Sequence, residues 1–261
     1  KYKINLIFNP EFLSQGEAID NFLNPQRIVI GVNNKESRNL MEEIYADFNC
    51  PKLFMDMKSA EISKYACNNF LAIKLAYINE IANLCERLEI NIENVLKVMK
   101  SDKRIGEFYL NPGIGYGGSC LPKDTKALAM LAKENNIELH IVEATINSNN
   151  KQRNKLLEKL DKYYDKKDDL NVAILGLSFK ANTNDIRESQ TIETIQKLQG
   201  NVKRIVCYDN KKSTIESCKK LFETEKNIFF TDDIKETLKD SDVCMIFNQE
   251  EALTEIIKAY G

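Results

Sequence analysis

The chain has 261 residues, of which 43% are hydrophobic and 29% charged, a composition typical of a globular protein with two or three domains. Its 37 basic and 39 acidic residues nearly cancel, which gives no indication of a nucleic-acid or membrane-surface partner. The sequence contains no apolar run of about 18 residues that would span a membrane, and its first residues lack the apolar core of a signal peptide.

Cysteine and histidine usage restricts the chemistry further. Seven cysteines occur without a CxxC pair, which predicts a reducing, cytoplasmic setting with mostly buried free thiols. His140 is the only histidine and has apolar neighbours, so we expect a packed or edge residue. A single histidine disfavours Ser-His-Asp catalysis and His-rich zinc sites, and we predict no metal site.

Residues 1–57 have the pattern of half a doubly wound α/β domain. Short apolar runs at 4–8, 27–32 and 52–56 alternate with helix-like stretches, as buried parallel strands do. A dinucleotide-binding fold normally starts with a glycine-rich turn, and none precedes these runs. We therefore expect the second half of such a domain, without its GxGxxG half.

Residues 58–165 are predicted to form a central helical domain. Apolar residues between 60 and 88 recur at spacings of three and four, which predicts one helix of about seven turns. Further helices are predicted at 122–135 and roughly 141–162. The lysine- and aspartate-rich run 162–169 is expected to be a solvated linker.

Residues 166–261 are predicted to form a second, nucleotide-type α/β domain with a parallel sheet. Its strands are expected at 172–179, 203–209, 227–230 and 242–247, with helices between them. The chain ends after one more predicted helix, so we expect this domain to be incomplete.

The segment NPGIGYGGSCLPKD carries the most specific chemical signal. Four of the ten glycines fall between 113 and 118, and glycine permits close backbone approach to a ligand. Pro122 suits the first turn of a helix, which puts Cys120 at a helix N-terminus, where partial positive charge favours a thiolate. The alternative is a turn that merely contains a small buried cysteine.

Three other features are candidates for the same chemistry. Lys64 and Asn68 are spaced i,i+4 on the long helix and could hold an oxyanion, unless they form only a solvated polar face. Glu11 follows the first apolar run, and its carboxylate could act as an acid or base or could cap a helix. Basic residues including Lys180 and Arg187 follow the 172–179 run, as phosphate ligands or as solvated loop charges.

Together these segments resemble the UDP-glucose/GDP-mannose dehydrogenase family. NPEFL, the KxxxN helix, RIG, GYGGSCLPKD and FKxxTxDxRES occur in the family's order along the whole chain. The resemblance implies an NAD-dependent, four-electron oxidation of the C6 alcohol of UDP-glucose to the carboxylate of UDP-glucuronate. It also implies a Rossmann-like UDP-binding domain and a homodimer across the long central helix.

The resemblance assigns a role to each matching residue. For catalysis it implies Cys120 as the nucleophile, and Lys64 with Asn68 as the pair that stabilises the C6 oxyanion. It implies Asp124 as the carboxylate that works with the catalytic water, and Glu11 as the base for thioester hydrolysis. For the UDP-sugar it implies Tyr109, Gly117 and Lys180, with Arg104 reaching a neighbouring subunit's site. Lys123 and Arg187 match positions near the NAD phosphates.

The chain also departs from the family pattern. Gln15 replaces a second acidic residue, and Ala181 replaces an occasional basic residue. Family members begin with a strand–GxGxxG–helix unit, and without that unit we expect this chain alone to be inactive. Ser119 and Lys123 favour the UDP-glucose or GDP-mannose branches over the amino-sugar branch. Three alternatives stay open: GDP-mannose or another nucleotide sugar as substrate, a non-catalytic nucleotide-sugar-binding or dimerisation module, and an unrelated thiol aldehyde dehydrogenase.

Overall fold

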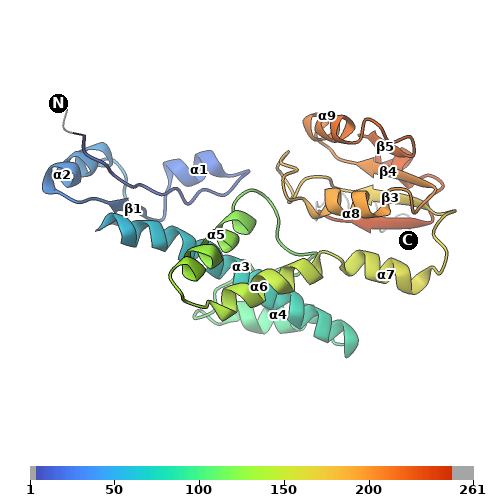
Figure 1. Ribbon diagram of the computed structural model, residues 1–261, viewed down its shortest axis with the longest axis horizontal. Coiled ribbons are helices and arrows are strands. Elements are labelled where there is room, and N and C mark those ends of the chain that lie inside the picture. The colour runs from blue at the N-terminus through green and yellow to red at the C-terminus, as the bar shows by residue number, and fades with distance from the viewer. Residues whose placement is uncertain (1–3, 249–261) are drawn as a thin grey trace. The chain divides into compact units, whose positions relative to one another are not determined.

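The computed structural model describes residues 4–248, which divide into two units between Phe70 and Leu71. The predicted α/β fold with parallel sheets is confirmed (Figure 1). Within residues 4–248 no helix has the length and apolarity that crossing a membrane requires.

The first unit is built on a parallel β–α–β element. Strand β1 (Ile28–Gly31) pairs in parallel with β2 (Lys52–Met55), and α2 (Lys35–Ile44) connects them. The Asn34 side chain caps α2 by accepting from the Ser37 amide at 2.8 Å. The short helix α1 (Ala18–Leu23) precedes β1, and a small core around Ile30 and Met41 lies between sheet and helix.

The predicted strand at 4–8 is wrong. Only Phe8 pairs with another strand residue, through an antiparallel bridge to Gly31. Ile4 and Leu6 are 85% and 68% exposed, and the segment has no further ladder partner among residues 4–248. An apolar run becomes a strand only where a neighbouring strand takes up its backbone hydrogen bonds.

Helix α3 (Met57–Arg87) is the long helix that the apolar spacing predicted, and it is 31 residues long. It begins beside β1, where a Cβ on Gly31 would lie 2.9 Å from the Ala60 side chain. Its residues belong to the first unit up to Phe70 and to the second unit beyond.

The second unit continues with further helices. These are α4 (Ile92–Ser101), which the sequence analysis did not predict, α5 (Leu121–Glu134), α6 (His140–Gln152) and α7 (Lys155–Tyr163). A small core of Ile78, Leu96 and Leu110 joins α3 and α4. The predicted single helix at 141–162 is wrong, because the chain breaks at Arg153 and Asn154. The Asn154 amide bonds back only three residues, to Lys151, and its carbonyl starts α7.

A four-stranded parallel sheet in the order β5-β4-β3-β6 forms the rest of the described chain. Its strands are β3 (Asn171–Leu175), β4 (Arg204–Tyr208), β5 (Ile228–Thr231) and β6 (Val243–Ile246), and its helices are α8 (Gln190–Leu198), α9 (Lys212–Leu221) and α10 (Ile234–Leu238). β3 is shorter than predicted because Gly176 has a φ of +88° and turns the chain out of the sheet. The helix predicted at the end of the chain lies outside the described residues.

The cysteines are less buried than predicted. All seven are free, but only Cys85, Cys207 and Cys218 are buried, while Cys120 and Cys244 are exposed. His140 is also exposed and lies 3.4 Å from Glu138, so of the two expected settings, packed or edge, the packed one is wrong. It is the first residue of α6, whose first buried residue is Val142.

Candidate active site

Cys120 is the N-cap residue of α5 and its thiol is exposed. Its carbonyl accepts from the Asp124 amide at 2.9 Å, which starts the helix, and Pro122 occupies the first turn as its missing N–H allows. The side chain makes no capping hydrogen bond. The thiol thus stands at the positive end of a 14-residue helix, open to a reacting partner.

Asp124 lies one helical turn after Cys120 and is only 2% exposed. Its carboxylate pairs with the ammonium group of Lys123, which is 66% exposed. A buried carboxylate remains charged at low energetic cost only when cations or donors compensate it. The pair therefore places a buried carboxylate beside an exposed ammonium group in the first turn of α5.

The two glycines before the cysteine permit close contacts that a side chain would block. A Cβ on Gly117 would lie 2.3 Å from the Glu188 carbonyl oxygen, and one on Gly118, whose φ is +79°, would lie 2.6 Å from the Phe179 ring. Lys180 follows Phe179, and its ammonium lies 5.9 Å from that ring's centroid. The structure thus brings Lys180 to the glycine turn that leads to Cys120.

Arg187 also lies in the neighbourhood of Cys120. The Asp185 carboxylate, bonded to the guanidinium at 2.7 Å, raises the pKa of Arg187, and charge on Cys120 raises it slightly further. Asp185 is 9% exposed whereas the Arg187 side chain is 67% exposed. The buried carboxylate therefore holds a guanidinium that is itself open to solvent.

Arg104 and Tyr109 lie in the loop between α4 and α5. Arg104 forms a two-nitrogen ion pair with Asp102, whose carboxylate raises the pKa of the guanidinium, and its side chain is 89% exposed. Tyr109 has a φ of +61°, an uncommon conformation for an aromatic residue. The structure does not join Arg104 to the other predicted residues of its own chain.

In the first unit, Lys64 on α3 is joined to Glu11. Its ammonium donates to the Glu11 carbonyl and, at 3.1 Å, to the Glu11 carboxylate, and it lies 5.1 Å from the centroid of Phe12. The other carboxylate oxygen of Glu11 accepts from the Leu13 amide at 2.7 Å. Asn68, one turn beyond Lys64, is 8% exposed and is therefore no part of a solvated face.

The predicted residues thus form two groups. Lys64, Asn68 and Glu11 belong to the first unit, while Cys120, Lys123, Asp124, Gly117, Lys180 and Arg187 belong to the second. Sequence reasoning missed two contacts of the glycine turn, the Phe179 ring and the backbone carbonyl of Glu188. Both lie in the run FKANTNDIRES, of which only the charged side chains were considered.

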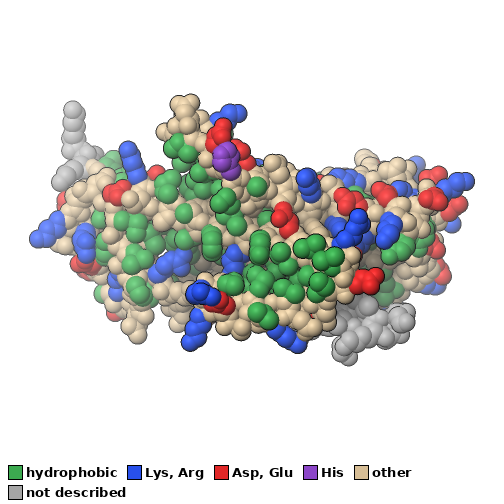
Figure 2. Space-filling model, turned by 90° about the horizontal axis from the view of Figure 1, so that it is seen from below, with side chains coloured by type: hydrophobic (Ala, Val, Ile, Leu, Met, Phe, Trp, Pro, Cys, Tyr) green, Lys and Arg blue, Asp and Glu red, His purple; other side chains and the backbone are tan. Residues whose placement is uncertain are grey.

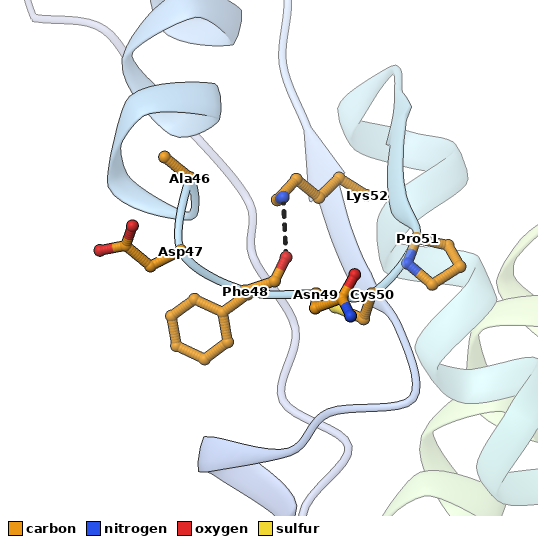
Figure 3. A pocket seen from close by; sticks show the side chains of 7 residues that line it. All are labelled: Ala46, Asp47, Phe48, Asn49, Cys50, Pro51 and Lys52. Atoms are coloured by element: carbon orange, nitrogen blue, oxygen red, sulfur yellow. Dashed lines mark hydrogen bonds between the residues drawn. The ribbon is translucent and has the colours of Figure 1, made fainter.

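The hollows of the described surface do not coincide with these groups. One of about 500 Å³ lies in the α2–β2 loop, between Ala46 and Lys52, where the Lys52 ammonium donates to the Phe48 carbonyl at 3.0 Å (Figure 3). Another of about 470 Å³ is lined by α3, α6 and α7. Within residues 4–248 no three His, Cys, Asp or Glu side chains are grouped as metal ligands are.

Comparison with protein families gives three matches along the chain. Residues 1–49 match the NAD binding domain of the UDP-glucose/GDP-mannose dehydrogenase family, residues 58–151 its central domain and residues 173–260 its UDP binding domain. The three matches follow one another in chain order and cover most of the sequence.

Individual proteins are similar over nearly the whole chain. A UDP-glucose 6-dehydrogenase of Rickettsia bellii is 41% identical over 94% of the chain, and UDP-glucose 6-dehydrogenase TuaD of Bacillus subtilis is 37% identical over 94%. The solved UDP-glucose dehydrogenase of Pyrobaculum islandicum is 31% identical and superimposes with a TM-score of 0.91 over 95% of the chain. The chain spans 57%, 52% and 57% of the lengths of these proteins.

Proposed function

Because the chain belongs to the UDP-glucose/GDP-mannose dehydrogenase family, we propose that it serves the NAD-dependent oxidation of UDP-glucose to UDP-glucuronate. The observation that carries this proposal is the exposed Cys120 thiol at the N-terminus of α5, beside a buried carboxylate and two exposed cations. The UDP-glucose 6-dehydrogenases at 41% and 37% identity support the same substrate.

Cys120 is the proposed nucleophile. The C6 alcohol is first oxidised to the aldehyde, and the Cys120 thiolate then attacks the aldehyde carbon to give a thiohemiacetal. A second oxidation of that carbon leaves a thioester, which water hydrolyses to release the carboxylate and the thiol. NAD, when bound, supplies the hydride acceptor for both oxidations.

Four further side chains are proposed to manage charge and protons. Lys64 stabilises the oxygen anion at C6, and Asn68 donates to the same oxygen. Asp124 orients the water that hydrolyses the thioester, and its burial beside Lys123 supports a fixed orientation. Glu11 accepts a proton from that water, and its contact with the Lys64 ammonium at 3.1 Å places it beside the group that stabilises the C6 oxygen.

The nucleotide sugar is proposed to contact Tyr109, Gly117 and Lys180. Support comes from the glycine turn, where the missing Cβ of Gly117 permits close approach, and from Lys180, whose ammonium can pair with a phosphate. Arg104 is proposed to act in the site of a second subunit, since its side chain is 89% exposed and its guanidinium is paired with Asp102.

The exposed cations fit the anionic part of a dinucleotide. Lys123 and Arg187 side chains are 66% and 67% exposed, and each is held by a buried aspartate. Such a guanidinium or ammonium pairs well with a diphosphate. We assign these residues to the NAD phosphates, and since residues 1–57 contain no GxGxxG turn we expect the 261-residue chain alone to form no NADH from UDP-glucose.

A homodimer across α3 and a cytoplasmic location are part of the proposal. Tyr77 and Leu84 lie on one side of α3 at a spacing of seven, Leu88 follows the last residue of the helix, and the three side chains are 52–57% exposed. Figure 2 shows hydrophobic side chains gathered on the face seen from below, over the helical part of the chain. An apolar patch of this kind is typical of a surface that a second subunit covers. The seven free cysteines support a reducing compartment.

Calorimetric titration with UDP-glucose tests the proposal on the chain as it is. We expect saturable binding that GDP-mannose does not displace, and at least a tenfold loss of affinity, about 1.4 kcal/mol, in Lys180→Ala. Lys219→Ala, an exposed lysine on α9, is the matched control and should bind as the unchanged chain does. Displacement by GDP-mannose would favour that sugar nucleotide, and absence of binding to either would refute the assignment.

A further inference from the structure

The segment that leads to Cys120 is held by buried side-chain amides instead of by a helix or a strand. Residues 111–118 form neither element, so their backbone polar groups lack the usual partners. Buried backbone groups without partners destabilise a fold strongly. The partners in this segment are Asn79, Asn149, Gln152 and Gln190, all of them at most 9% exposed.

Asn149 on α6 holds Tyr116 at both of its backbone groups. Its Oδ1 accepts from the Tyr116 amide at 2.7 Å, and its Nδ2 donates to the Tyr116 carbonyl at 3.1 Å. The side chain thus pairs with the backbone as a neighbouring strand would. Gly115, with a φ of +97°, makes the contact possible, because a Cβ there would lie 2.6 Å from Asn149 Oδ1.

Gly113 is held in the same way, by residues of two helices. Its amide donates to Asn79 Oδ1 on α3 at 2.7 Å, and its carbonyl accepts from Gln152 Nε2 on α6 at 2.6 Å. Gln152 is itself oriented, since its Oε1 accepts from Asn83 Nδ2 at 2.8 Å. The two helices therefore fix the start of the segment at both backbone polar groups of Gly113.

Gln190, the first residue of α8, completes the set by donating to the Gly115 carbonyl at 2.8 Å. Residues 113 to 116 are thereby attached to three helices at five backbone groups. Cys120 follows Tyr116 by four residues. A loop attached this densely has little freedom to rotate or shift the residue that follows it, which is the condition that a reacting group requires.

We infer that Asn149 and Gln152 are positioning residues that set the orientation of the Cys120 thiol through the backbone of residues 113–116. The inference rests on the proposed function insofar as Cys120 is the nucleophile. It goes beyond that function by assigning a role to two buried amides on α6 that do not touch the reacting atoms.

The rate at which iodoacetamide alkylates each cysteine, resolved by peptide mass spectrometry between pH 6 and 9, measures that orientation in the complete chain. Asn149→Leu removes both hydrogen bonds to Tyr116 at similar volume. We expect the Cys120 rate at pH 8 to change at least threefold and its pH profile to move. The Cys244 thiol, exposed at β6, serves as the internal reference and should react at an unchanged rate.

Thr145→Val is the matched control. Thr145 lies one turn before Asn149 on α6, is 5% exposed, and donates only within its helix, to the Ile141 carbonyl at 2.8 Å. Thr145→Val should lower the melting temperature without altering the pH profile of Cys120 alkylation. An equal change in both variants, or no change in Asn149→Leu, overturns the inference. Should Asn149→Leu fail to fold, Gln152→Met is measured against the same criteria.

The unchanged chain separates this inference from the proposed function. If Cys120 reacts no faster than Cys244 and UDP-glucose does not protect it, the assignment of Cys120 as nucleophile fails, whatever the variants do. If Cys120 is fast and protected but insensitive to both α6 substitutions, only the positioning role fails.

Discussion

Gly118→Ala is expected to destabilise the chain through two separate effects. The residue has a φ of +79°, which side chains rarely adopt, and its new Cβ would lie 2.6 Å from Cε2 and 2.8 Å from two further atoms of the Phe179 ring. Real Cβ contacts are longer than this. The ring must therefore move, and Lys180, whose ammonium lies 5.9 Å from its centroid, moves with it.

The magnitude follows from adding the two effects. Left-handed backbone costs alanine about 1–2 kcal/mol relative to glycine, and overpacking against a ring adds about 1–3 kcal/mol. Gly106 has a φ of +75° but nothing within 4 Å of its Cβ position, so Gly106→Ala should show the backbone effect alone. Gly113, with open space and no positive φ, should tolerate alanine within about 1 kcal/mol, since alanine also stiffens the unfolded chain.

Urea unfolding followed by far-ultraviolet circular dichroism measures the series, because the chain has no tryptophan for fluorescence. We expect losses of about 2–5, 1–2 and 0–1 kcal/mol for Gly118→Ala, Gly106→Ala and Gly113→Ala. UDP-glucose affinity should fall in Gly118→Ala alone. If Gly118→Ala costs no more than Gly106→Ala, the contact between the glycine turn and Phe179 is wrong.

Three further outcomes are expected. Burial raises the pKa of Cys218 from 9.0 to about 12, so above pH 9 the folded chain keeps a proton that the unfolded chain loses. The contribution of Cys218 to stability should be full below pH 9 and fall by about 1.4 kcal/mol by pH 10. Burial also raises the pKa of Cys207 well above 9.0, so Cys218→Ala should lessen the alkaline loss of stability without abolishing it. Asn34→Ala removes the cap of α2 and Asn91→Ala that of α4, and each should lower stability by about 1 kcal/mol. Amide hydrogen exchange should quicken near the altered cap. A uniform change over all amides would contradict the division of the chain into two units. Leu84→Glu places a charge on the exposed apolar side of α3 and should convert the proposed dimer into a monomer by sedimentation, whereas Lys219→Ala should not.

The parts of the fold that the sequence predicted best are those set by one local pattern. Helix α3 follows from apolar spacing alone, and the strands around Ala173 and Val206 follow from buried apolar runs. The run at 4–8 shows the opposite case, because its apolar residues are compatible with a strand but a ladder needs a partner elsewhere in the chain. The break at Asn154 was missed since the charges and apolar residues on either side continue one helical period.

The candidate site was predictable to a similar degree. Gly117, Gly118 and Pro122 predicted the turn and helix start that place Cys120, because their backbone properties act locally. The amides that hold this segment were missed, since a polar residue on a helix normally faces solvent. One signal was present: Asn79 with Asn83, and Asn149 with Gln152, are spaced i,i+4 and i,i+3, which places each pair on one helical face.

Asp209 shows that the neighbouring loop follows the same principle. It lies at the carboxyl end of β4, where a carboxylate in an open α/β sheet often contacts a ligand, yet it is 4% exposed. Its Oδ2 accepts from the Leu177 amide and its Oδ1 from the Lys211 amide, both at 2.9 Å. Asp209 therefore fixes the turn that leads to Phe179 and Lys180, as Asn149 fixes the turn that leads to Cys120.

The two fixed turns meet where Gly118 lies against the Phe179 ring. Each turn is held by buried side chains whose hydrogen bonds cannot be exchanged for water without leaving a backbone group unpaired. If Gly118 and the Phe179 ring are pushed apart, the chain must therefore break one of these sets of hydrogen bonds or distort the left-handed backbone of Gly118. For this reason a single added methyl group at Gly118 should affect both stability and the binding of UDP-glucose, while the same group at Gly106, outside the contact, should affect stability alone.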